Sequence, residues 1–208
     1  MGAEAAARDI ARRVYGDQSE TIERYVDILT SRGVEWGLLG PREPERIWSR
    51  HILNCAALDG LVPQGSRVID VGSGAGLPGL VLAILRPDLE VVLVESLLRR
   101  ATFLELAVDE LGLSPRVSVV RGRAEEQKVT ADVVTCRAVA PLQKLLKWTT
   151  PHFLPHGRLV ALKGASAPEE VAAAAQELRR HKLVAEVVSI RADQEAEATQ
   201  AIVVRRAF

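Results

Sequence analysis

The sequence predicts an α/β protein in which a mostly parallel, seven-stranded sheet follows an N-terminal helical extension. Apolar, β-branched runs alternate with amphipathic helical segments from residue 66 onward. The last two apolar runs, 183–191 and 200–206, have no helix between them. Alternating strands and helices are typical of a parallel sheet that is covered on both faces. The final pair of runs predicts a hairpin whose last strand is antiparallel to the others.

The individual elements follow from composition and apolar spacing. In the extension, helices are expected at 3–14, 18–32 and 43–58, and Gly33 is expected to end the second. Glycine and proline then break the pattern at 60–65, which divides the chain into an extension at 1–64 and a second domain at 65–208. There, strands are expected at 66–71, 90–95, 116–121, 132–136 and 157–163, and helices at 78–86, 97–111, 141–149 and 167–181.

Composition excludes several other classes of protein. The 208 residues are 48% apolar and 26% charged, as in folded globular proteins. The longest apolar stretch, near 77–85, is too short to span a membrane, and the first residues do not resemble a secretory signal. The two cysteines, Cys55 and Cys136, lack the spacing of a zinc site or a disulfide framework. We therefore expect a cytoplasmic protein without a metal or a membrane partner.

Positive charge is concentrated in one part of a neutral chain. The 27 Lys and Arg residues equal the 27 Asp and Glu residues, a total that does not indicate a nucleic-acid partner. Residues 115–165, however, carry nine basic and three acidic side chains. A basic surface can therefore exist on this protein, although by charge alone an ordinary solvated surface is the simpler interpretation.

The stretch VIDVGSGAGLPGLVLAIL, residues 68–85, carries the clearest binding signal. Three glycines in five positions directly follow the first predicted strand, where open α/β sheets bind ligands. Glycine permits positive φ and lets a ligand approach the backbone closely. The dinucleotide fingerprint GxGxxG requires glycine where this chain has Leu77. A GxGxG turn after a strand that carries Asp70 is instead the form that holds the amino-acid end of S-adenosylmethionine.

Two further strand ends supply groups suited to a nucleoside. Glu95 closes the second strand, where a carboxylate can accept hydrogen bonds from both ribose hydroxyls. Ala124 and Glu125 follow the third strand, where a side chain or a backbone N–H commonly meets the adenine edge. The expected cofactor contacts are Asp70, Gly72, Ser73, Gly74, Gly76, Glu95, Ala124 and Glu125.

The residues constrain the methyl acceptor less tightly. No NPPY-like motif for an exocyclic amine follows the fourth strand, and only Lys163 is present of the set that ribose methylation uses. Cys136 leaves open a covalent adduct with a pyrimidine, which carbon-5 methylation requires, although a cysteine that ends a buried strand is more often a core residue. Guanine N7 already has a free lone pair, so alignment with the sulfonium methyl group and desolvation can supply most of the catalysis there. The lack of an obvious general base is compatible with N7.

Several blocks, in order along the chain, resemble the small-subunit ribosomal RNA (guanine-N7) methyltransferases, once called glucose-inhibited division protein B. The blocks are RHILNC at 50–55, DVGSGAGLPG at 70–79, ESLLRRATFL at 95–104, CRA at 136–138 and ALKG at 161–164. The chain departs from the family at Asn54, Cys55, Glu95 and Cys136, where the family has Asp, Ser, Asp and Ser. Serine at the place of Cys136 argues against a covalent role for this thiol.

The resemblance implies a class I, Rossmann-like methyltransferase that moves a methyl group from S-adenosyl-L-methionine to N7 of guanine 527. This guanine lies in the 530 loop of 16S ribosomal RNA, and S-adenosyl-L-homocysteine is the second product. Matching positions add Leu77 and Arg137 to the expected cofactor contacts, and Arg137 has a second possible role in holding the target guanine.

The resemblance also makes 16S rRNA, or the small ribosomal subunit, the expected partner. The sequence has no conspicuous apolar interface pattern, so a monomer is expected. Basic residues that position the RNA through its phosphates are then expected. The candidates are Arg50, His51, Arg123, Lys144, Lys147 and Lys163. Two alternatives stay open, namely another RNA methyltransferase that acts through Cys136 and a non-catalytic, adenosylmethionine-binding factor of ribosome assembly.

Overall fold

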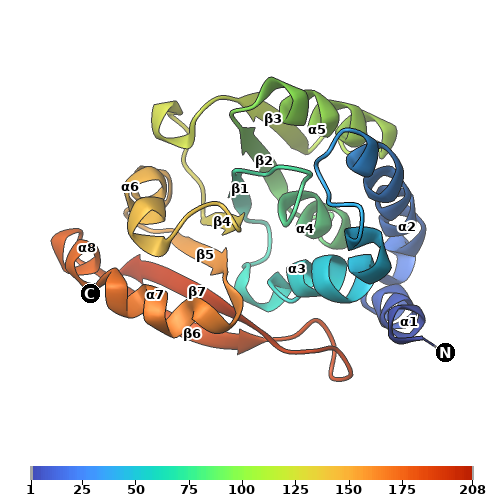
Figure 1. The fold of residues 1–208 in the computed structure, drawn as a ribbon. Helices are drawn as coiled ribbons and strands as arrows, with labels where there is room; N and C mark the ends of the chain where they lie inside the picture. The colour runs from blue at the N-terminus through green and yellow to red at the C-terminus, as the bar shows by residue number, and fades with distance from the viewer. Residues whose placement is uncertain (1, 208) are drawn as a thin grey trace.

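A seven-stranded sheet forms the centre of the molecule, which the computed structural model describes for residues 2–207 (Figure 1). Met1 and Phe208, the outer ends of the predicted domains, lie outside the described residues. The strand order is β3-β2-β1-β4-β5-β7-β6. The strands are β1 (Arg67–Val71), β2 (Glu90–Glu95), β3 (Val117–Arg121), β4 (Val133–Arg137), β5 (Arg158–Leu162), β6 (Leu183–Ile190) and β7 (Thr199–Arg206).

The direction of each strand follows the predicted pattern. All neighbours in the sheet are parallel except that β7 runs antiparallel to both β5 and β6. This confirms the mostly parallel sheet and the C-terminal hairpin. The chain order reverses between β1 and β4, so the carboxyl ends of these two strands mark the switch point at which α/β sheets bind ligands.

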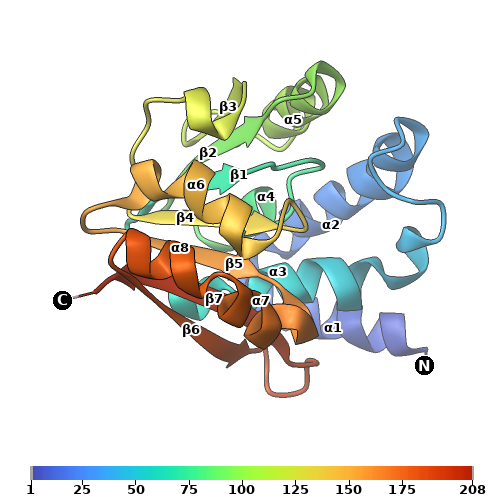
Figure 2. The same ribbon diagram turned by 60° about the vertical axis from the view of Figure 1, so that its left-hand side comes forward.

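Helices cover both faces of the sheet (Figures 1 and 2). One face packs against the N-terminal segment, α4 (Gly79–Leu85) and α5 (Leu98–Glu110), and the other against α6 (Leu142–Phe153), α7 (Ala167–Ala173) and α8 (Ala175–Arg180). Strand β2 shows the alternation that makes this possible, because Val91 and Leu93 belong to the first apolar core and Val92 and Val94 to the second.

The N-terminal segment is helical, as predicted, but one boundary prediction is wrong. Its elements are α1 (Ala3–Tyr15), η1 (Gly16–Gln18), α2 (Ser19–Ile28), η2 (Leu29–Gly33), η3 (Glu43–Arg46), η4 (Ile47–Leu53), α3 (Asn54–Ala56) and η5 (Asp59–Leu61). Helical turns continue past Gly33 to Glu35, and the chain leaves the helix at Gly37, whose φ is +65°. Gly37 rather than Gly33 therefore adopts the left-handed conformation that ends helices.

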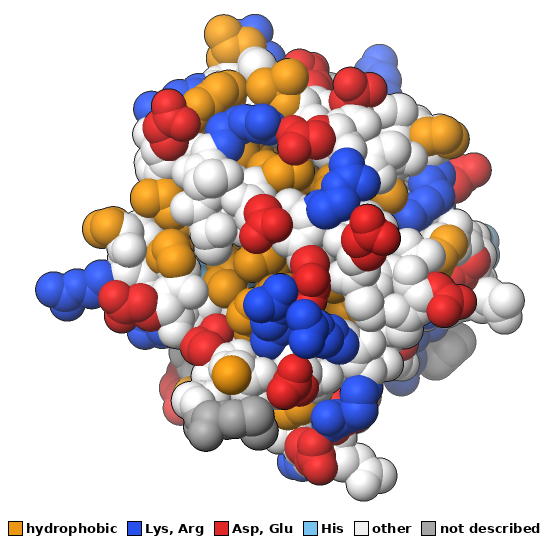
Figure 3. Space-filling view, turned by 90° about the vertical axis from the view of Figure 1, so that its right-hand side faces the viewer, with side chains coloured by type: hydrophobic (Ala, Val, Ile, Leu, Met, Phe, Trp, Pro, Cys, Tyr) orange, Lys and Arg blue, Asp and Glu red, His pale blue; other side chains and the backbone are white. Residues whose placement is uncertain are grey.

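The N-terminal segment and the sheet share one apolar core. Tyr25, Leu29 and Ile52 are fully buried in the same cluster as α4 and β2. The hydroxyl of Tyr25 also donates a hydrogen bond to the carbonyl of Ala75, at 2.8 Å, so this segment supports the turn after β1. Seen from the side of α1 and α2, acidic and basic side chains are interspersed over the surface (Figure 3). The division into two domains stays a prediction.

The second half of the sequence shows two smaller differences from the predicted elements. The helix predicted at 167–181 is two helices, because Ala174, with φ −87° and ψ 2°, interrupts it. Helix α6 continues to Phe153, beyond the predicted end at residue 149, and has Pro151 in its last turn. Among residues 2–207, no helix is both long and apolar enough to cross a membrane.

Candidate cofactor and acceptor site

The glycine turn links β1 to α4 and borders a cavity of about 450 Å³. Its three glycines have φ values of +70°, +59° and +99° in chain order. A Cβ at Gly72 would lie 2.7 Å from Val139 Cγ2, and one at Gly76 would lie 2.5 Å from Leu80 Cδ1. A Cβ at Gly74 would approach only the carbonyl of Gly72, at 3.9 Å. Close packing therefore requires glycine at 72 and 76, whereas Gly74 leaves space on the cavity side.

Asp70 lies behind the turn and not in the cavity, which corrects its expected cofactor contact. The side chain is fully buried, and Oδ2 accepts a hydrogen bond of 3.0 Å from the N–H of Gly79. Ser73 Oγ donates to the Asp70 carbonyl at 2.8 Å, while Oδ1 has no protein partner. Desolvation raises the pKa of Asp70 to about 7. We infer that Asp70 fixes the geometry of the turn.

This burial predicts how the stability of the cofactor-free protein depends on pH. Because folding raises the pKa of Asp70 from 3.8 to about 7, the folded state binds more protons than the unfolded state between these values. The free energy of unfolding therefore falls as pH rises through this window. We expect Asp70→Asn to remove that part of the dependence and to raise Tm at pH 8 by at least about 3 °C relative to the wild type.

Thermal unfolding between pH 5 and pH 8, in steps of about half a unit, measures this effect across the range in which the Asp70 carboxyl ionises. Asp109→Asn, on the exposed surface of α5, is the matched control and should keep the pH dependence of the wild type. An Asp70→Asn curve parallel to that of the wild type would contradict the placement of Asp70.

Glu95 stands at the end of β2 with its carboxylate against the turn. Oε2 accepts a hydrogen bond from Gly74 N at 3.0 Å, and Oε1 accepts one from Leu97 N at 2.9 Å. The residue is only 3% exposed, yet it borders the same cavity as the turn. A carboxylate oxygen has two lone pairs, so each oxygen keeps one acceptor position for a ribose hydroxyl. This arrangement supports the expected role of Glu95.

A second cavity, of about 270 Å³, adjoins the first at Gly72. Its lining residues are Val71, Gly72, Val94, Ser96, Gly122, Arg123, Ala124, Glu125, Val139 and Trp148. Ala124 and Glu125 thus line a cavity next to the glycine turn, and their contact with the adenine stays a prediction. Buried His152 has Nε2 at 2.9 Å from the Ala124 carbonyl and Nδ1 at 2.7 Å from that of Val129, so it holds this segment in place.

A third and larger cavity, of about 750 Å³, opens on the other side of the loop that follows β4. Arg137, Ala138 and Val139 border both this cavity and the one at the glycine turn. Ala138 has a φ of +54°, a conformation uncommon outside glycine. These three residues form the wall between the two cavities, which we call the shared wall. Arg137 thus lies within reach of ligands in either cavity.

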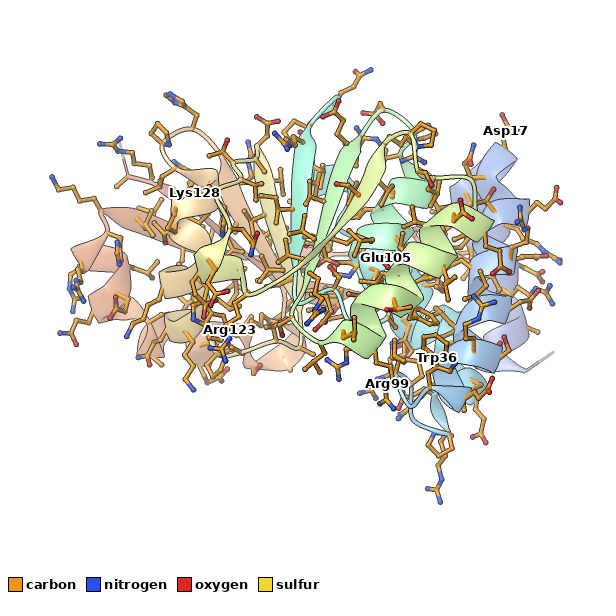
Figure 4. All side chains as sticks on the ribbon, turned by 90° about the horizontal axis from the view of Figure 1, so that it is seen from above. Asp17, Trp36, Arg99, Glu105, Arg123 and Lys128 are labelled. Atoms are coloured by element: carbon orange, nitrogen blue, oxygen red, sulfur yellow. The ribbon has the colours of Figure 1, made fainter. Side chains whose placement is uncertain are left out.

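Two of the candidate RNA residues occupy exposed places at these cavities. The side chain of Arg50 is 55% exposed and borders the third cavity, and that of Arg123 is 70% exposed beside the second. In Figure 4, Arg123 lies along the same edge of the molecule as Arg99 and Trp36. Lys144 and Lys147 are exposed on α6 but line none of the three cavities.

The structure does not support the expected phosphate contacts of Lys163 and His51. The Lys163 side chain is 6% exposed, and its Nζ lies 2.6 Å from the Ala140 carbonyl and 2.8 Å from Glu170 Oε2. Its charge is therefore already paired, and it tethers the loop after β4. His51 borders the cavity at the glycine turn but is buried, at 6% exposure, and makes protein contacts through both ring nitrogens.

Several cavity residues were missed by sequence reasoning. These are Leu38, Leu39, Ser96, Leu97, Arg100 and Val139 around the expected cofactor, and Arg46, Ser49 and Asn54 in the third cavity. Position after a strand end was a usable signal for Ser96, Leu97 and Val139. Of the expected cofactor contacts, Gly76 and Asp70 line none of these three cavities, whereas Leu77, Ser73 and Arg137 line the first.

Both cysteines are buried and free. Cys136 belongs to the core beneath α6 and lines none of the three cavities, and burial raises the pKa of its thiol to about 12. A buried thiol that stays protonated is a poor nucleophile. Within residues 2–207, no group of three or more His, Cys, Asp or Glu side chains is placed to hold a metal ion.

Cys136→Ser is therefore expected to leave methyl transfer within about twofold of the wild-type rate, because an inert core thiol does no chemistry. The rate of methyl transfer per folded molecule measures this. Loss of transfer in a variant that still folds and binds cofactor would instead favour covalent chemistry through Cys136.

Solved structures with similar folds come from methyltransferases. The mitomycin 7-O-methyltransferase MmcR is 15% identical with a TM-score of 0.62, and the match covers 94% of this chain and 68% of that one. A methyltransferase from Geobacter sulfurreducens in complex with S-adenosyl-L-homocysteine is 17% identical with a TM-score of 0.50, over 65% of this chain and 66% of that one. At these identities the likeness shows the fold alone, which is the Rossmann-like methyltransferase fold expected from the sequence.

Comparison of sequences is more specific. The family model described as rRNA small subunit methyltransferase G matches residues 18–203. The ribosomal RNA small subunit methyltransferase G of Salinispora tropica is 58% identical over 170 residues, which cover 78% of this chain and 70% of that protein. The residues that the family model matches include the glycine turn, the strand ends and the shared wall described above. On these findings, the chain belongs to the rRNA small subunit methyltransferase G family.

Proposed function

We propose that this protein transfers a methyl group from S-adenosyl-L-methionine to N7 of guanine 527, in the 530 loop of 16S rRNA. Membership of an rRNA methyltransferase family supports the reaction class. The observation that carries the proposal is the shared wall, because Arg137 borders both the cavity at the glycine turn and the larger cavity beside Arg50. Methyl transfer requires the two reacting atoms to come within about 3–3.5 Å of each other, so the proposal places the two ligands on either side of these residues and in contact past them.

The chain's own residues fit the cofactor. Gly74 leaves space for the methionine portion, Glu95 keeps acceptor positions for the ribose, and Ala124 and Glu125 border the adjoining cavity for the adenine. A methyltransferase with a related fold was solved in complex with S-adenosyl-L-homocysteine, which supports a cofactor of this kind. S-adenosylmethionine supplies an electrophilic methyl group on a sulfonium. Trp148 adds an aromatic surface to the adenine cavity.

Transfer to guanine N7 requires little acid–base catalysis by the protein. The N7 lone pair is free in the neutral base, so no proton is removed before attack. Arg137 can donate a hydrogen bond to guanine O6 and leave N7 open toward the cofactor. Arg50, at the outer side of the third cavity, is suited to a backbone phosphate. Alignment and exclusion of water then supply the rate enhancement, and no general base is required.

Methyl transfer to small subunits from cells that lack the modification tests the proposal. Tritium from labelled S-adenosylmethionine should enter 16S rRNA, and mass mapping should place one 7-methylguanine at position 527. Subunits that already carry this modification should accept no label. Label at another nucleotide would overturn the assignment of the target, and cofactor binding without any label in RNA would indicate an assembly factor.

A further inference from the structure

A carboxylate, an imidazole and a guanidinium form a hydrogen-bonded chain that ends at the shared wall. His51 on η4 has Nε2 at 2.5 Å from Glu43 Oε2 and Nδ1 at 2.6 Å from Arg137 Nη2. The other terminal nitrogen of Arg137, Nη1, lies 3.4 Å from Cys55 Sγ. His51 and Cys55 are buried, at 6% and 0% exposure. Neither His51 nor Cys55 lines the third cavity, whereas His51 borders the cavity at the glycine turn. The guanidinium is therefore held by partners that lie outside the third cavity.

The chemistry of the three groups fixes the state of the imidazole. An arginine guanidinium only donates hydrogen bonds, so Nδ1 of His51 must accept. An ionised carboxylate only accepts, so Nε2 must donate. His51 is then neutral and protonated at Nε2. Desolvation and the charge of Arg137 lower the pKa of His51, and Arg50 lowers it with a smaller effect. The hydrogen bond and the charge of Glu43 raise this pKa, but the net change is downward.

Glu43 anchors the outer end of the chain and links it to the third cavity. Its Oε1 accepts a hydrogen bond of 2.6 Å from Arg46, and its Oε2 lies 4.0 Å from Arg50 Nε. Arg46 and Arg50 both line the third cavity, whereas Glu43 does not. The hydrogen bonds from His51 and Arg46 lower the pKa of Glu43 to about 2, so the carboxylate stays charged at working pH.

We propose that Glu43 and His51 are positioning residues that hold the Arg137 guanidinium at the shared wall, in the orientation that methyl transfer requires. This inference rests on the proposed function. His51 acts through its Nδ1 lone pair, and Glu43 acts by keeping the proton on Nε2. A histidine that merely fills the core would satisfy its ring nitrogens without affecting the rate.

The proposal has a consequence for pH. Protonation of His51 at Nδ1 removes the lone pair that accepts the hydrogen bond from Arg137. Nδ1 then becomes a donor that faces the guanidinium, which is itself only a donor. Arg137 then loses its partner and meets a positive charge. The rate of transfer should therefore fall on the acid side, along the titration of His51. Glu43, Arg50 and Arg137 are the charged groups that face the ring from η3, η4 and β4, and changes at these residues should move that titration.

Nitrogen-15 NMR of the histidine rings tests the chain without any transfer assay. The protein has four histidines, so the His51 signals can be assigned by substitution. We expect the Nε2–H form of His51 at neutral pH, a higher pKa of this ring in Arg137→Ala and a lower one in Glu43→Gln. An Nδ1–H form, or a titration unchanged by Arg137→Ala, would overturn the proposal whatever the protein methylates.

Transfer to unmodified small subunits, measured against pH, tests the effect on the reaction. An asparagine amide can place its oxygen near the position of Nδ1, and a glutamine amide reaches the position of Nε2. We expect His51→Gln to lower kcat about tenfold, as loss of a hydrogen bond to a charged group does, with little change in KM for the cofactor. His51→Asn should restore much of kcat and flatten the acid limb, and Glu43→Gln should move that limb to lower pH.

Glu45→Gln, at an exposed carboxylate on the same turn, is the matched control and should behave as the wild type. An acid limb that His51→Asn leaves in place would overturn the positioning role. If His51→Gln fails to fold, the pH profiles of His51→Asn and Glu43→Gln still test the positioning role of His51 and Glu43. A wild-type protein that transfers no methyl group would refute the proposed function alone, and the ring titrations would then stand as the test of the chain.

Discussion

Replacement of Gly74 by valine is expected to weaken binding of S-adenosyl-L-methionine by at least about 100-fold, equivalent to about 2.7 kcal/mol. Gly74 borders the cavity, and a Cβ there would meet only one atom, 3.9 Å away, so the new side chain would occupy ligand space. Its φ of +59° adds strain of about 1–2 kcal/mol, which lowers stability without removing the fold. Calorimetric titration with the cofactor and thermal unfolding measure the two effects separately.

Gly112→Val separates ligand exclusion from backbone strain. Gly112 has a φ of +69°, is exposed, and has no atom within 4 Å of an added Cβ. The control should therefore lose similar stability and keep its affinity for the cofactor. The assignment of Gly74 to the cofactor cavity would be contradicted if Gly74→Val bound the cofactor as tightly as the wild type. It would also be contradicted if Gly74→Val and Gly112→Val lost the same amount of cofactor affinity.

Replacement of Arg137 by alanine is expected to lower methyl transfer to small subunits by about 100-fold, the scale seen when one positioned charged donor is removed from a site of group transfer. The guanidinium stands in the shared wall, and truncation leaves both cavities without this donor. The fold should persist, because Arg137 is the last residue of β4 and is not part of the apolar cores. Transfer rates and cofactor affinity, measured on the same preparation, test the prediction.

The same measurements assign the role of Arg137. A rise in the cofactor Kd that accounts for the whole loss would identify the methionine carboxylate as its ligand. A lower kcat with an unchanged cofactor Kd would identify the target guanine. Arg67→Ala, at the exposed start of β1 and so at the opposite edge of the sheet, should leave both quantities unchanged. Transfer by Arg137→Ala within twofold of the wild type would remove Arg137 from the site.

The sequence predicted most of the architecture because the relevant signals are local. The continuous apolar run of β2, Val91 to Val94, predicts a strand that is buried on both faces. The helical spacing of apolar residues between the strands predicts the helices that connect them. The glycine turn was recognisable because positive φ at three close positions leaves little choice of residue. Glu95 could be placed because the carboxyl ends of parallel strands meet at one edge.

Predictions that depended on contacts between segments distant in the sequence were corrected by the structure. Gly33 was expected to end a helix, but Gly37 does so. Gly37 has a positive φ of +65° and Gly33 does not, and residue type alone does not show which of two nearby glycines takes this conformation. Lys163 was expected to meet phosphate, but Glu170 and the Ala140 carbonyl already pair with its ammonium group. Neither partner could be inferred from the spacing along the chain.

By itself, the sequence determined the α/β class, the order of the strands along the chain and the glycine turn after β1, since backbone preferences and apolar spacing act over a few residues. Only the tertiary structure decided what each charged group does there. Asp70 lies behind the turn, and the contacts of His51 with Glu43 and Arg137 join η3, η4 and β4. His51 and Arg137 are 86 residues apart in the sequence, and a contact of this kind exists only once the chain has folded.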